Sequence, residues 1–354
     1  MATAESNDKQ QESGSSHRRL LIGIVIAVMV VGILVVALDW KQARQVLITA
    51  NWALLVPALL ASGLSYLLLN IAFALVTRSW GIELGVWRLI EIGFVSTVLN
   101  HLVTAGGAPG YTVRVLHMRR PGISTKQILA VSLFHIYLSL LALMAMLPVA
   151  MVYLLLNSSL SPGATASLGA VAVGMVIALG VAGALVFSDA LRTRLLGLAE
   201  RLWYKVTHRD VSESLESFGD TMAEGVSVFR SRPRRFALIM GLIVADWASS
   251  MGALWLCFAA LGTSLSPGVL LSGYTLGITA GLASMVPGGL GVQEGSMAGI
   301  YHLLGIPLHQ SVLAAVLFRV VYYFIPYLIS LIFHWHLLRQ MGQADRAPDD
   351  KEAS

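Results

Sequence analysis

Charged residues are scarce in this sequence, and their scarcity excludes a soluble globular domain. They make up 12% of the 354 residues, while 56% of the residues are hydrophobic and the mean hydropathy is +0.74. Several apolar runs extend over about 18 to 25 residues, which is longer than a soluble core helix needs and enough to cross about 30 Å of hydrocarbon. The composition therefore predicts an all-α integral membrane protein.

Cysteine is almost absent as well. The single Cys257 lies within an apolar run, so the sequence supports no intrachain disulfide and no cysteine-based metal site. The nine histidines are scattered, and His334 and His336 flank Trp335 at the end of an apolar run, where interfacial residues are expected. We therefore predict that the chain needs neither a metal ion nor another cofactor.

The sequence also lacks the interleaved basic and aromatic residues of nucleic-acid-binding platforms, and it contains no reader motif. The net charge of +5 does not change this conclusion, because nine of the 24 Lys and Arg residues lie within 188–235, between two apolar runs. Basic residues in such a place are typical of loops on the cytoplasmic side of a membrane. The charge thus indicates membrane topology, and we predict no nucleic-acid partner.

Six uninterrupted apolar runs are predicted to cross the membrane. They are 20–38, 53–76, 127–156, 164–187, 236–261 and 310–338. The first run follows a polar tail, 1–19, that ends in two arginines, and no small-residue cleavage pattern follows it. We therefore expect an uncleaved signal anchor with a cytoplasmic N-terminus. The transmembrane domain is predicted over 20–338, with a second cytoplasmic tail over 339–354.

Two further apolar segments, 89–120 and 269–304, are interrupted by proline and glycine at 100–110 and 287–295. Proline ends a helix, and glycine releases the backbone from helical geometry. Such a break is tolerated at membrane depth only where protein or a water-filled cavity covers the freed polar groups. Interrupted segments at corresponding positions of two halves indicate the binding site of a transporter.

The limbs on either side of each break are too short to cross the bilayer comfortably. We therefore interpret the two segments as re-entrant helical hairpins that enter from opposite faces, as in an inverted repeat. The outer loops then hold only Lys41 and Arg44 as cations, and 188–235 becomes a cytoplasmic amphipathic linker. The predicted location is the bacterial cytoplasmic (inner) membrane, with both termini in the cytoplasm.

The residues around the two breaks resemble a family of flippase-like transmembrane domains. The resemblance is carried by 287–294 (PGGLGVQE), Leu304-Gly305 and Arg319, and by 106–114 (GGAPGYTVR) with 122–124 (GIS) in the first half. This family includes the membrane part of bacterial lysylphosphatidylglycerol synthases and free-standing relatives. The resemblance extends over most of the chain, about residues 20–335, and implies a lipid-translocating membrane domain.

The family's bifunctional members carry a soluble aminoacyl-transfer domain after the membrane part. Only about fifteen residues follow the last predicted helix here, so we expect a free-standing member, and the lysyl-lipid substrate does not carry over. A separate lipid-synthesising enzyme is then an expected partner, beside the membrane lipid as substrate. The sequence leaves a homodimer open.

Three charged residues near the breaks, Arg114, Glu294 and Arg319, are the main candidates for binding a substrate. An arginine in the middle of a span is costly unless it faces the protein interior, and a guanidinium suits phosphate because it donates two parallel hydrogen bonds. Each residue has an alternative role. Glu294 could serve the start of its helix, Arg319 could form a structural ion pair with Glu294, and Arg114 could reach the cytoplasmic interface.

Asp246 and Asn100 complete the predicted substrate-binding set. Asp246 lies too deep in its apolar run for an interface residue, and Asn100 directly precedes the first break, where capping of freed backbone is the alternative role. The breaks also supply backbone amides at helix starts, which favour anions. The residues predicted to form this backbone site are Gly106, Gly107, Pro109, Pro287, Gly288, Gly289 and Gly291.

We therefore predict a lipid translocator rather than an enzyme. A polar cavity at the midplane would accept an anionic or zwitterionic headgroup while the lipid tails stay in the bilayer, and it would open alternately to the two leaflets. Two alternatives stay open. A secondary transporter of a small soluble solute would use the same architecture. A membrane enzyme of lipid-linked glycan metabolism would need paired carboxylates in an outer loop, where the sequence offers only Asp39.

Overall fold

The computed structural model describes residues 40–103, 108–119, 122–158, 161–187 and 232–344, together with residues 194, 197 and 227. Every regular element in these ranges is a helix, which confirms the predicted all-α membrane fold. The predicted first span, Gly106 and Gly107 of the first break, most of the linker 188–235 and most of the two terminal tails lie outside the described residues.

Within the described ranges, four helical stretches are long and apolar enough to cross a membrane. They are Trp52–Ser79, Thr125–Asn157, Pro233–Ala260 and Leu308–Arg339. The elements that form them are η1 (Trp52–Leu54) with α3 (Leu55–Ser79), α6 (Thr125–Asn157), α10 (Pro233–Ala260), and α13 (Leu308–Arg319) continued by the π-helical segment η3 (Val320–Phe324) and α14 (Ile325–Ala344). These stretches coincide with four of the predicted crossing runs.

Two more helices complete the ends of the bundle. α7 (Pro162–Phe187) packs against α6 and corresponds to the predicted run 164–187. The short α2 (Trp40–Thr49) precedes α3 and packs against α13. Local sequence signals fix where the long helices start. The Ser124 hydroxyl accepts a hydrogen bond from the backbone N–H of Gln127 at 3.2 Å at the start of α6, and Pro233 is the first residue of α10.

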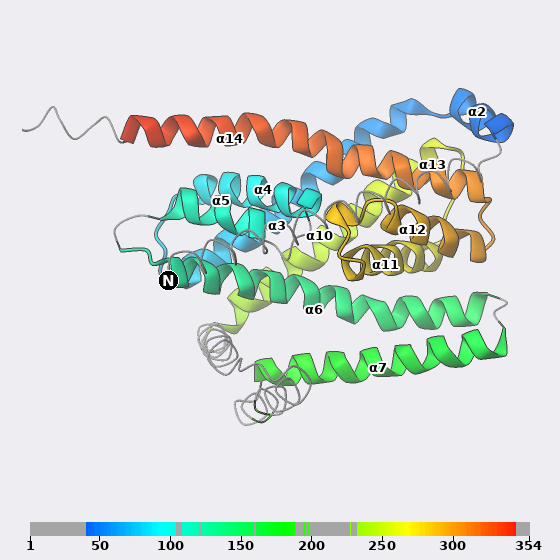
Figure 1. Ribbon diagram of the computed structural model, residues 1–354, viewed down its shortest axis with the longest axis horizontal. Helices are drawn as coiled ribbons and strands as arrows, with labels where there is room; N and C mark the ends of the chain where they lie inside the picture. The colour runs from blue at the N-terminus through cyan, green and yellow to red at the C-terminus, as the bar shows by residue number, and fades with distance from the viewer. Residues whose placement is uncertain are drawn as a thin grey trace, which may run out of the picture.

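The two broken segments form hairpins that enter the bundle from opposite ends (Figure 1). The first hairpin consists of α4 (Val86–Val103) and α5 (Ala108–Met118), and the second of α11 (Pro267–Ala283), η2 (Pro287–Gly289) and α12 (Val292–Leu303). The returning limbs α5 and α12 have 11 and 12 residues, which gives lengths of about 17 and 18 Å at 1.5 Å per residue. Neither limb can cross a hydrocarbon layer of about 30 Å, which agrees with the predicted re-entrant hairpins.

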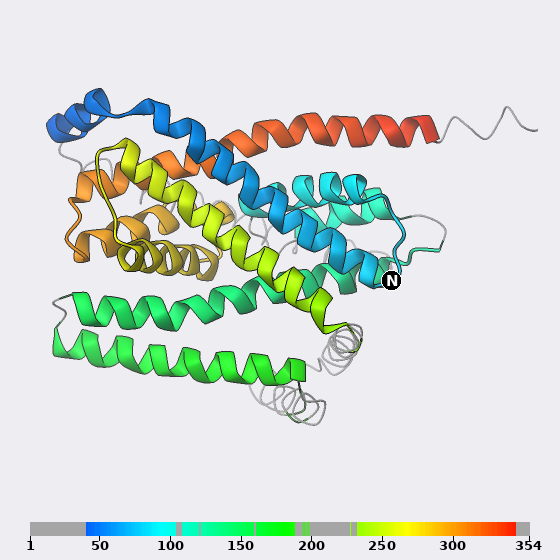
Figure 2. The same ribbon diagram turned by 180° about the vertical axis from the view of Figure 1, so that it is seen from behind.

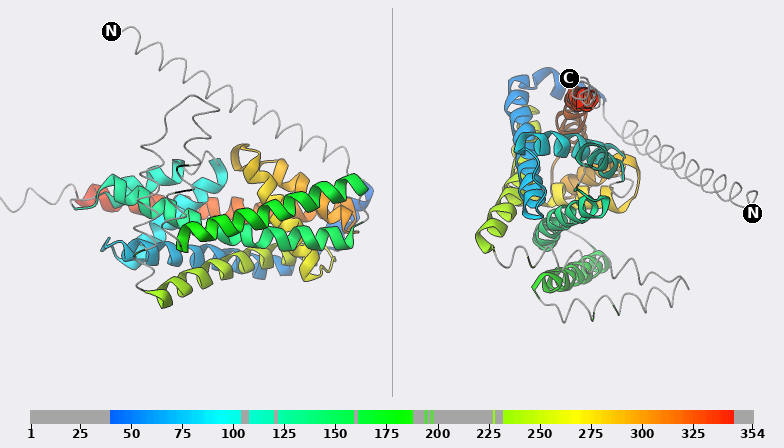
Figure 3. Two further views of the ribbon diagram at one scale, coloured as in Figure 1. Left: turned by 90° about the horizontal axis from the view of Figure 1, so that it is seen from below. Right: turned by 90° about the vertical axis from the view of Figure 1, so that its left-hand side faces the viewer.

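The long helices surround the hairpins. α3 and α10 pack against each other and cross the molecule diagonally, which is clearest in the view from behind (Figure 2). Seen end-on, α6 and α7 lie on one side of the bundle and α14 on the opposite side, with hairpin helices between them (Figure 3). This arrangement brings α4 of the first hairpin against η2 of the second.

Two apolar cores hold the hairpins in place. Phe73, Phe134, Leu138 and Ile243 are fully buried in the core that contacts the first hairpin. A second core contains side chains of α10, α11, α12 and α13, among them Phe258, Tyr274, Tyr301 and Phe318. In the turn of the second hairpin, Gly288 and Gly289 are buried, whereas Met285 and Leu290 are exposed.

Candidate functional site

The backbone of the second break adopts conformations that residues with side chains rarely take. α11 ends at Ala283, and the chain then passes through Gly288, with a φ of 63°, and Gly291, with a φ of 76°, before α12 begins. Met285 also has a positive φ, 52°, and its side chain is 86% exposed. A left-handed conformation costs a residue with a Cβ roughly 1–2 kcal/mol. The two turns around η2 therefore need glycine.

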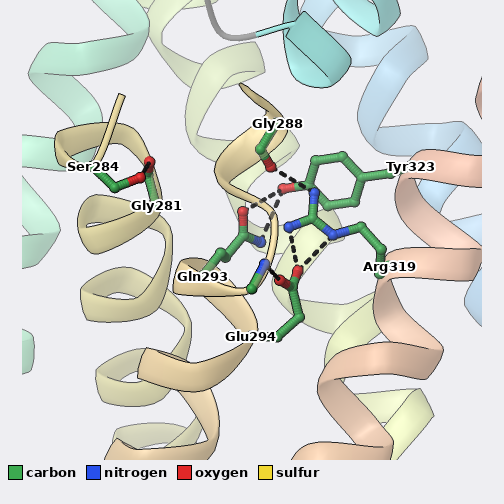
Figure 4. Close-up of polar contacts among 8 residues, drawn as sticks. Gly281, Ser284, Gly288, Gln293, Glu294, Arg319 and Tyr323 are labelled. Atoms are coloured by element: carbon green, nitrogen blue, oxygen red, sulfur yellow. Dashed lines mark hydrogen bonds and ion pairs between the residues drawn. The ribbon is translucent and has the colours of Figure 1, made fainter. Parts of the chain in front are cut away.

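Glu294 stabilises the start of α12. Its Oε2 accepts a hydrogen bond from the backbone N–H of Gly291 at 2.8 Å, as the third residue of a helix does in a capping box. This contact is the helix-start role that the sequence left open for Glu294. The other carboxylate oxygen, Oε1, faces Arg319 and is available for a second role (Figure 4).

Arg319 joins the carboxylate and the glycine turn. Its Nε donates to Glu294 Oε1 at 2.5 Å, its Nη2 forms an ion pair with the same oxygen, and its Nη1 donates to the carbonyl oxygen of Gly288 at 2.7 Å (Figure 4). Arg319 is the last residue of α13 and directly precedes the π-helical η3. Short π-helical segments in membrane and soluble proteins often occur at functional sites. The pair that the sequence suggested between Glu294 and Arg319 is present.

A tyrosine and a glutamine surround this ion pair. The Cζ atom of Arg319 lies 4.2 Å from the ring centroid of Tyr323, and Gln293 Nε2 donates to the Tyr323 hydroxyl at 3.0 Å (Figure 4). On the adjoining end of α11, the Ser284 hydroxyl donates to the carbonyl oxygen of Gly281 at 2.7 Å. The side chains of Glu294 and Arg319 are only 9% and 15% exposed. The second break is thus a nearly buried polar centre in which positive and negative charge balance.

The first hairpin reaches this centre through the last turn of α4. α4 packs against both η2 and η3, and His101, in the last turn of α4, has its ring centroid 5.6 Å from that of Tyr323. The Tyr66 hydroxyl of α3 lies 3.0 Å from His101 Nδ1. α4 and η3, more than 200 residues apart in the sequence, therefore meet beside Arg319, in the interior of the bundle.

Arg114 lies in α5 and is only 2% exposed. Its Nε donates to the Ser96 hydroxyl at 2.9 Å, and its Cζ lies 4.1 Å from the ring centroid of Phe73. Among the residues that the structure describes, no carboxylate forms an ion pair with Arg114. Such burial does not fit an arginine that extends to the cytoplasmic interface. The first hairpin thus contains a buried cation whose charge is not balanced by the described part of the chain.

The two remaining candidates have different surroundings. Asn100 Oδ1 accepts a hydrogen bond from the backbone N–H of Gly110 at 2.8 Å, which is the backbone-capping role, and Pro109 occupies the first turn of α5, where proline is tolerated. Asp246 lies in the middle of α10, 5% exposed, and accepts a hydrogen bond from the Ser65 hydroxyl. Across the described ranges, neither Arg114 nor Asp246 bonds directly to the Glu294–Arg319 pair.

The sequence analysis did not single out the aromatic residues at this centre. Tyr66, His101, Tyr322 and Tyr323 all lie within contact distance of one another or of Arg319. The available signals were the tyrosine pair three residues after Arg319 and the histidine directly after Asn100. Within the described residues, no three His, Cys, Asp or Glu side chains are grouped so that they could hold a metal ion.

Comparison with known proteins shows which family this chain matches. Residues 20–330 match the family described as the lysylphosphatidylglycerol synthase TM region. Three relatives from Methanothermobacter thermautotrophicus, each named a UPF0104 membrane protein, are 29% identical over 136 residues, 21% over 313 and 25% over 127. These matches cover 38%, 84% and 34% of this chain. The chain spans 39% of the first relative's length, 89% of the second's and 38% of the third's.

Proposed function

This chain belongs to the family of lysylphosphatidylglycerol synthase transmembrane regions, and from this membership and its buried polar centre we propose that it moves a lipid across a membrane. The matched family is the transmembrane part of the synthase, so the proposal assigns no covalent chemistry to the chain. The lipid is one with an anionic or zwitterionic headgroup. The family and the multi-pass helical fold support a transport role, and the site geometry supports the choice of substrate.

One observation carries the proposal: the two hairpins enter from opposite ends and meet at the buried Glu294–Arg319 pair. A headgroup crosses a bilayer slowly because it must leave water for hydrocarbon, and a charge at the bilayer centre costs about 2.5–3.5 kcal/mol even on insertion scales. A polar centre that both hairpins reach lowers this barrier, because protein groups replace the water that the headgroup loses. Hairpins that approach from opposite faces also suit a site that opens to either leaflet.

The charged residues have complementary roles in this proposal. Arg114 binds the phosphate of the headgroup, because it is buried, lacks a carboxylate partner among the described residues and still has guanidinium N–H groups beyond the Nε that Ser96 engages. At the centre, the phosphate of the lipid replaces the carboxylate of Glu294 as the partner of Arg319. The released carboxylate of Glu294 then pairs with the ammonium group of a zwitterionic headgroup. Asp246 belongs to the same polar interior.

We place the chain in the cytoplasmic membrane with both termini in the cytoplasm. The described helix ends on the side where the first hairpin enters carry most of the cations, at Arg78, Arg88, Arg119, Lys126 and Arg232–Arg235. The opposite side carries Lys41 and Arg44, on α2. Because basic residues are retained in the cytoplasm, the first hairpin enters from the cytoplasmic face and the second from the outer face.

Lipid movement in proteoliposomes tests the proposal directly. Wild-type protein is reconstituted with headgroup-labelled phosphatidylglycerol or phosphatidylethanolamine, and a leaflet-selective quencher reports the label that has crossed. The matched variants are Glu294→Gln and Arg319→Ala at the centre. The controls are Glu91→Gln, an acid on α4 outside the pair, and Arg78→Ala, an exposed arginine at the end of α3.

We expect faster label movement than in empty vesicles for wild type and both controls, and loss of that movement in the two central variants. Movement that persists in both central variants would keep lipid translocation and discard the site. If the wild type moves neither lipid faster than empty vesicles, lipid translocation is wrong for these headgroups, and transport of a small soluble solute becomes the better description of the same architecture.

A further inference from the structure

Asp246 is a buried carboxylate that the proposed headgroup site does not use. It lies in the middle of α10 and is 5% exposed. The Ser65 hydroxyl of α3 donates to its Oδ1, and its Oδ2 makes no hydrogen bond within the described residues. No Lys, Arg or His of these residues forms an ion pair with it. A carboxyl group at such depth needs either a counter-charge or a proton.

Within the part of the chain that the structure describes, the groups around Asp246 supply no counter-charge. The titratable side chains that face it are phenols, namely Tyr66 of α3, Tyr274 of α11 and Tyr322 of η3. α6 and α13 also pack against α10. Of their basic groups, His135 has its Nε2 3.2 Å from the carbonyl oxygen of Leu69, and Arg319 is engaged by Glu294. A proton is therefore the positive charge that fits this position.

A hydrogen-bonded connection leads from Asp246 to the π-helical segment next to Arg319. The Ser65 hydroxyl that donates to Asp246 lies 2.8 Å from the Tyr322 hydroxyl. Two neighbours on the same face of α3 bind the backbone of η3: the Ser62 hydroxyl donates to the carbonyl oxygen of Val321 at 3.2 Å, and the Tyr66 hydroxyl donates to that of Tyr322 at 2.9 Å. Hydrogen bonds therefore link Asp246 to the segment that directly follows Arg319.

We propose that Asp246 is the proton-binding site of a proton-coupled transporter, so that a proton is the second substrate. The inference rests on the proposed lipid translocation. A proton from water on one side binds a carboxylate oxygen of Asp246, crosses with the change in access of the central site and leaves to water on the other side. No other bond is made or broken. Protonation turns the Asp246 carboxylate from an acceptor only into a group that can also donate, which changes the hydrogen bonds of Ser65 and Tyr322 and so the position of η3.

Infrared spectroscopy of the purified protein tests proton binding without any transport assay. A protonated carboxylic acid absorbs in the C=O region apart from an ionised carboxylate. We expect such a band in the wild type, a titration of the band with pH, and its loss in Asp246→Asn. The matched control is Glu91→Gln, which removes a different acid from the bundle and keeps the band. The same C=O absorption in the wild type and Asp246→Asn at every pH overturns the proposal.

A pH gradient across proteoliposomes tests coupling. Each variant is measured with and without the gradient, and the result is the ratio between the two, so that a slower variant is compared only with itself. If one proton crosses with each lipid, a gradient of one pH unit can drive the ratio of labelled lipid between the two leaflets to about tenfold at most. This ratio is the leaflet asymmetry. We expect asymmetry approaching this limit for wild type and Glu91→Gln, a smaller one for Ser65→Ala and none for Asp246→Asn.

The outcomes separate the two proposals. If the wild type moves lipid equally with and without the pH gradient, lipid translocation stands and its coupling to protons is overturned. An equal gradient response in wild type and Asp246→Asn overturns the assignment to Asp246. If the wild type moves no lipid in any arm, the proposed function fails and the coupling of protons to lipid fails with it, while the infrared band still decides whether Asp246 binds a proton.

Discussion

An arginine with little exposure lies within the first hairpin and another lies on α13 beside the second, and the charges of the two arginines are balanced differently. Arg319, beside the second hairpin, is bound by Glu294 and by the carbonyl oxygen of Gly288. Arg114, within the first hairpin, has a serine hydroxyl and a phenylalanine ring as neighbours and no carboxylate among the described residues. The charges of Glu294 and Arg319 therefore balance each other, whereas Arg114 keeps a positive charge that an anionic ligand can balance. Under the proposed function, a phosphate would enter at Arg114 and compete with Glu294 at Arg319.

Arg319→Ala should cause the largest change, because it leaves Glu294 buried without its counter-charge. Breaking a buried ion pair on one side destabilises a protein by about 3–5 kcal/mol, so we expect a clearly lower thermal unfolding midpoint in detergent. The double variant Arg319→Ala/Glu294→Gln removes both charges and should recover part of this loss. Equal midpoints for the single and double variants would show that the pair is not the source of the effect.

Arg114→Gln should affect lipid movement more than stability, in contrast to the large loss of stability expected for Arg319→Ala. Removing this cation leaves no carboxylate unpaired among the described residues, so it should not lower the unfolding midpoint as Arg319→Ala does. It should slow movement of a phosphate-bearing lipid about 10- to 100-fold, since a hydrogen bond to a charged group contributes roughly 1.5–3 kcal/mol. Arg114→Lys keeps the charge but lacks the planar guanidinium, so its rate of lipid movement should lie between those of the wild type and Arg114→Gln. Proteoliposome rates and unfolding midpoints are measured together. A midpoint as low as that of Arg319→Ala would make Arg114 a structural residue.

Gly291→Ala tests the turn that holds Glu294 in place. Gly291 has a φ of 76° and a ψ of −44°, and residues held in sparsely populated backbone regions cost about 1–3 kcal/mol. We expect a loss of stability of that size in thermal unfolding, with slower lipid movement. Gly299→Ala, in the middle of α12 with open space around the new Cβ, is the control and should stabilise by about 0.5–1 kcal/mol. Similar losses in both would argue against strain at the turn.

Asn100→Ala should have the smallest effect. It removes the acceptor for the Gly110 N–H, and a lost cap of this kind costs about 1 kcal/mol. Asn100→Asp keeps the acceptor and should restore the unfolding midpoint, as the capping role requires. Ser124→Ala, which removes the cap of α6, provides a comparison outside the hairpins. Lipid movement well below that of Ser124→Ala would instead indicate that Asn100 contacts the substrate.

The positions of the hairpins could be predicted because their causes are local in the sequence. Pro287 with the following glycines ends one apolar segment, and 106–110 interrupts the other, irrespective of what surrounds them. The depth of Arg319 within its span was visible for the same reason, and an arginine at that depth requires a partner. Glu294 was the acid nearest to a break, so the sequence could suggest the pair although the residues lie 25 positions apart.

Other features depended on how the helices rotate and pack. Nothing along the chain connects Ser65 with Asp246, which are 181 residues apart, or places His101 of the first hairpin against Tyr323. The π-helical turn at Val320–Phe324 has no sequence signature, because its freed carbonyls are stabilised by α3 hydroxyls from Ser62 and Tyr66. Arg114 illustrates the same point, since its burial beneath Phe73 could not be distinguished from an interfacial position by sequence alone.

The sequence by itself determined that this chain is a helical membrane protein with two interrupted segments, because run length and hydropathy decide transfer into hydrocarbon one segment at a time. The tertiary structure alone decided which charges are balanced. The partner of a buried charge depends on the side of each helix that faces the interior and on contacts between distant segments. For that reason Glu294 neutralises Arg319, while Arg114 and Asp246 have no charged partner among the described residues.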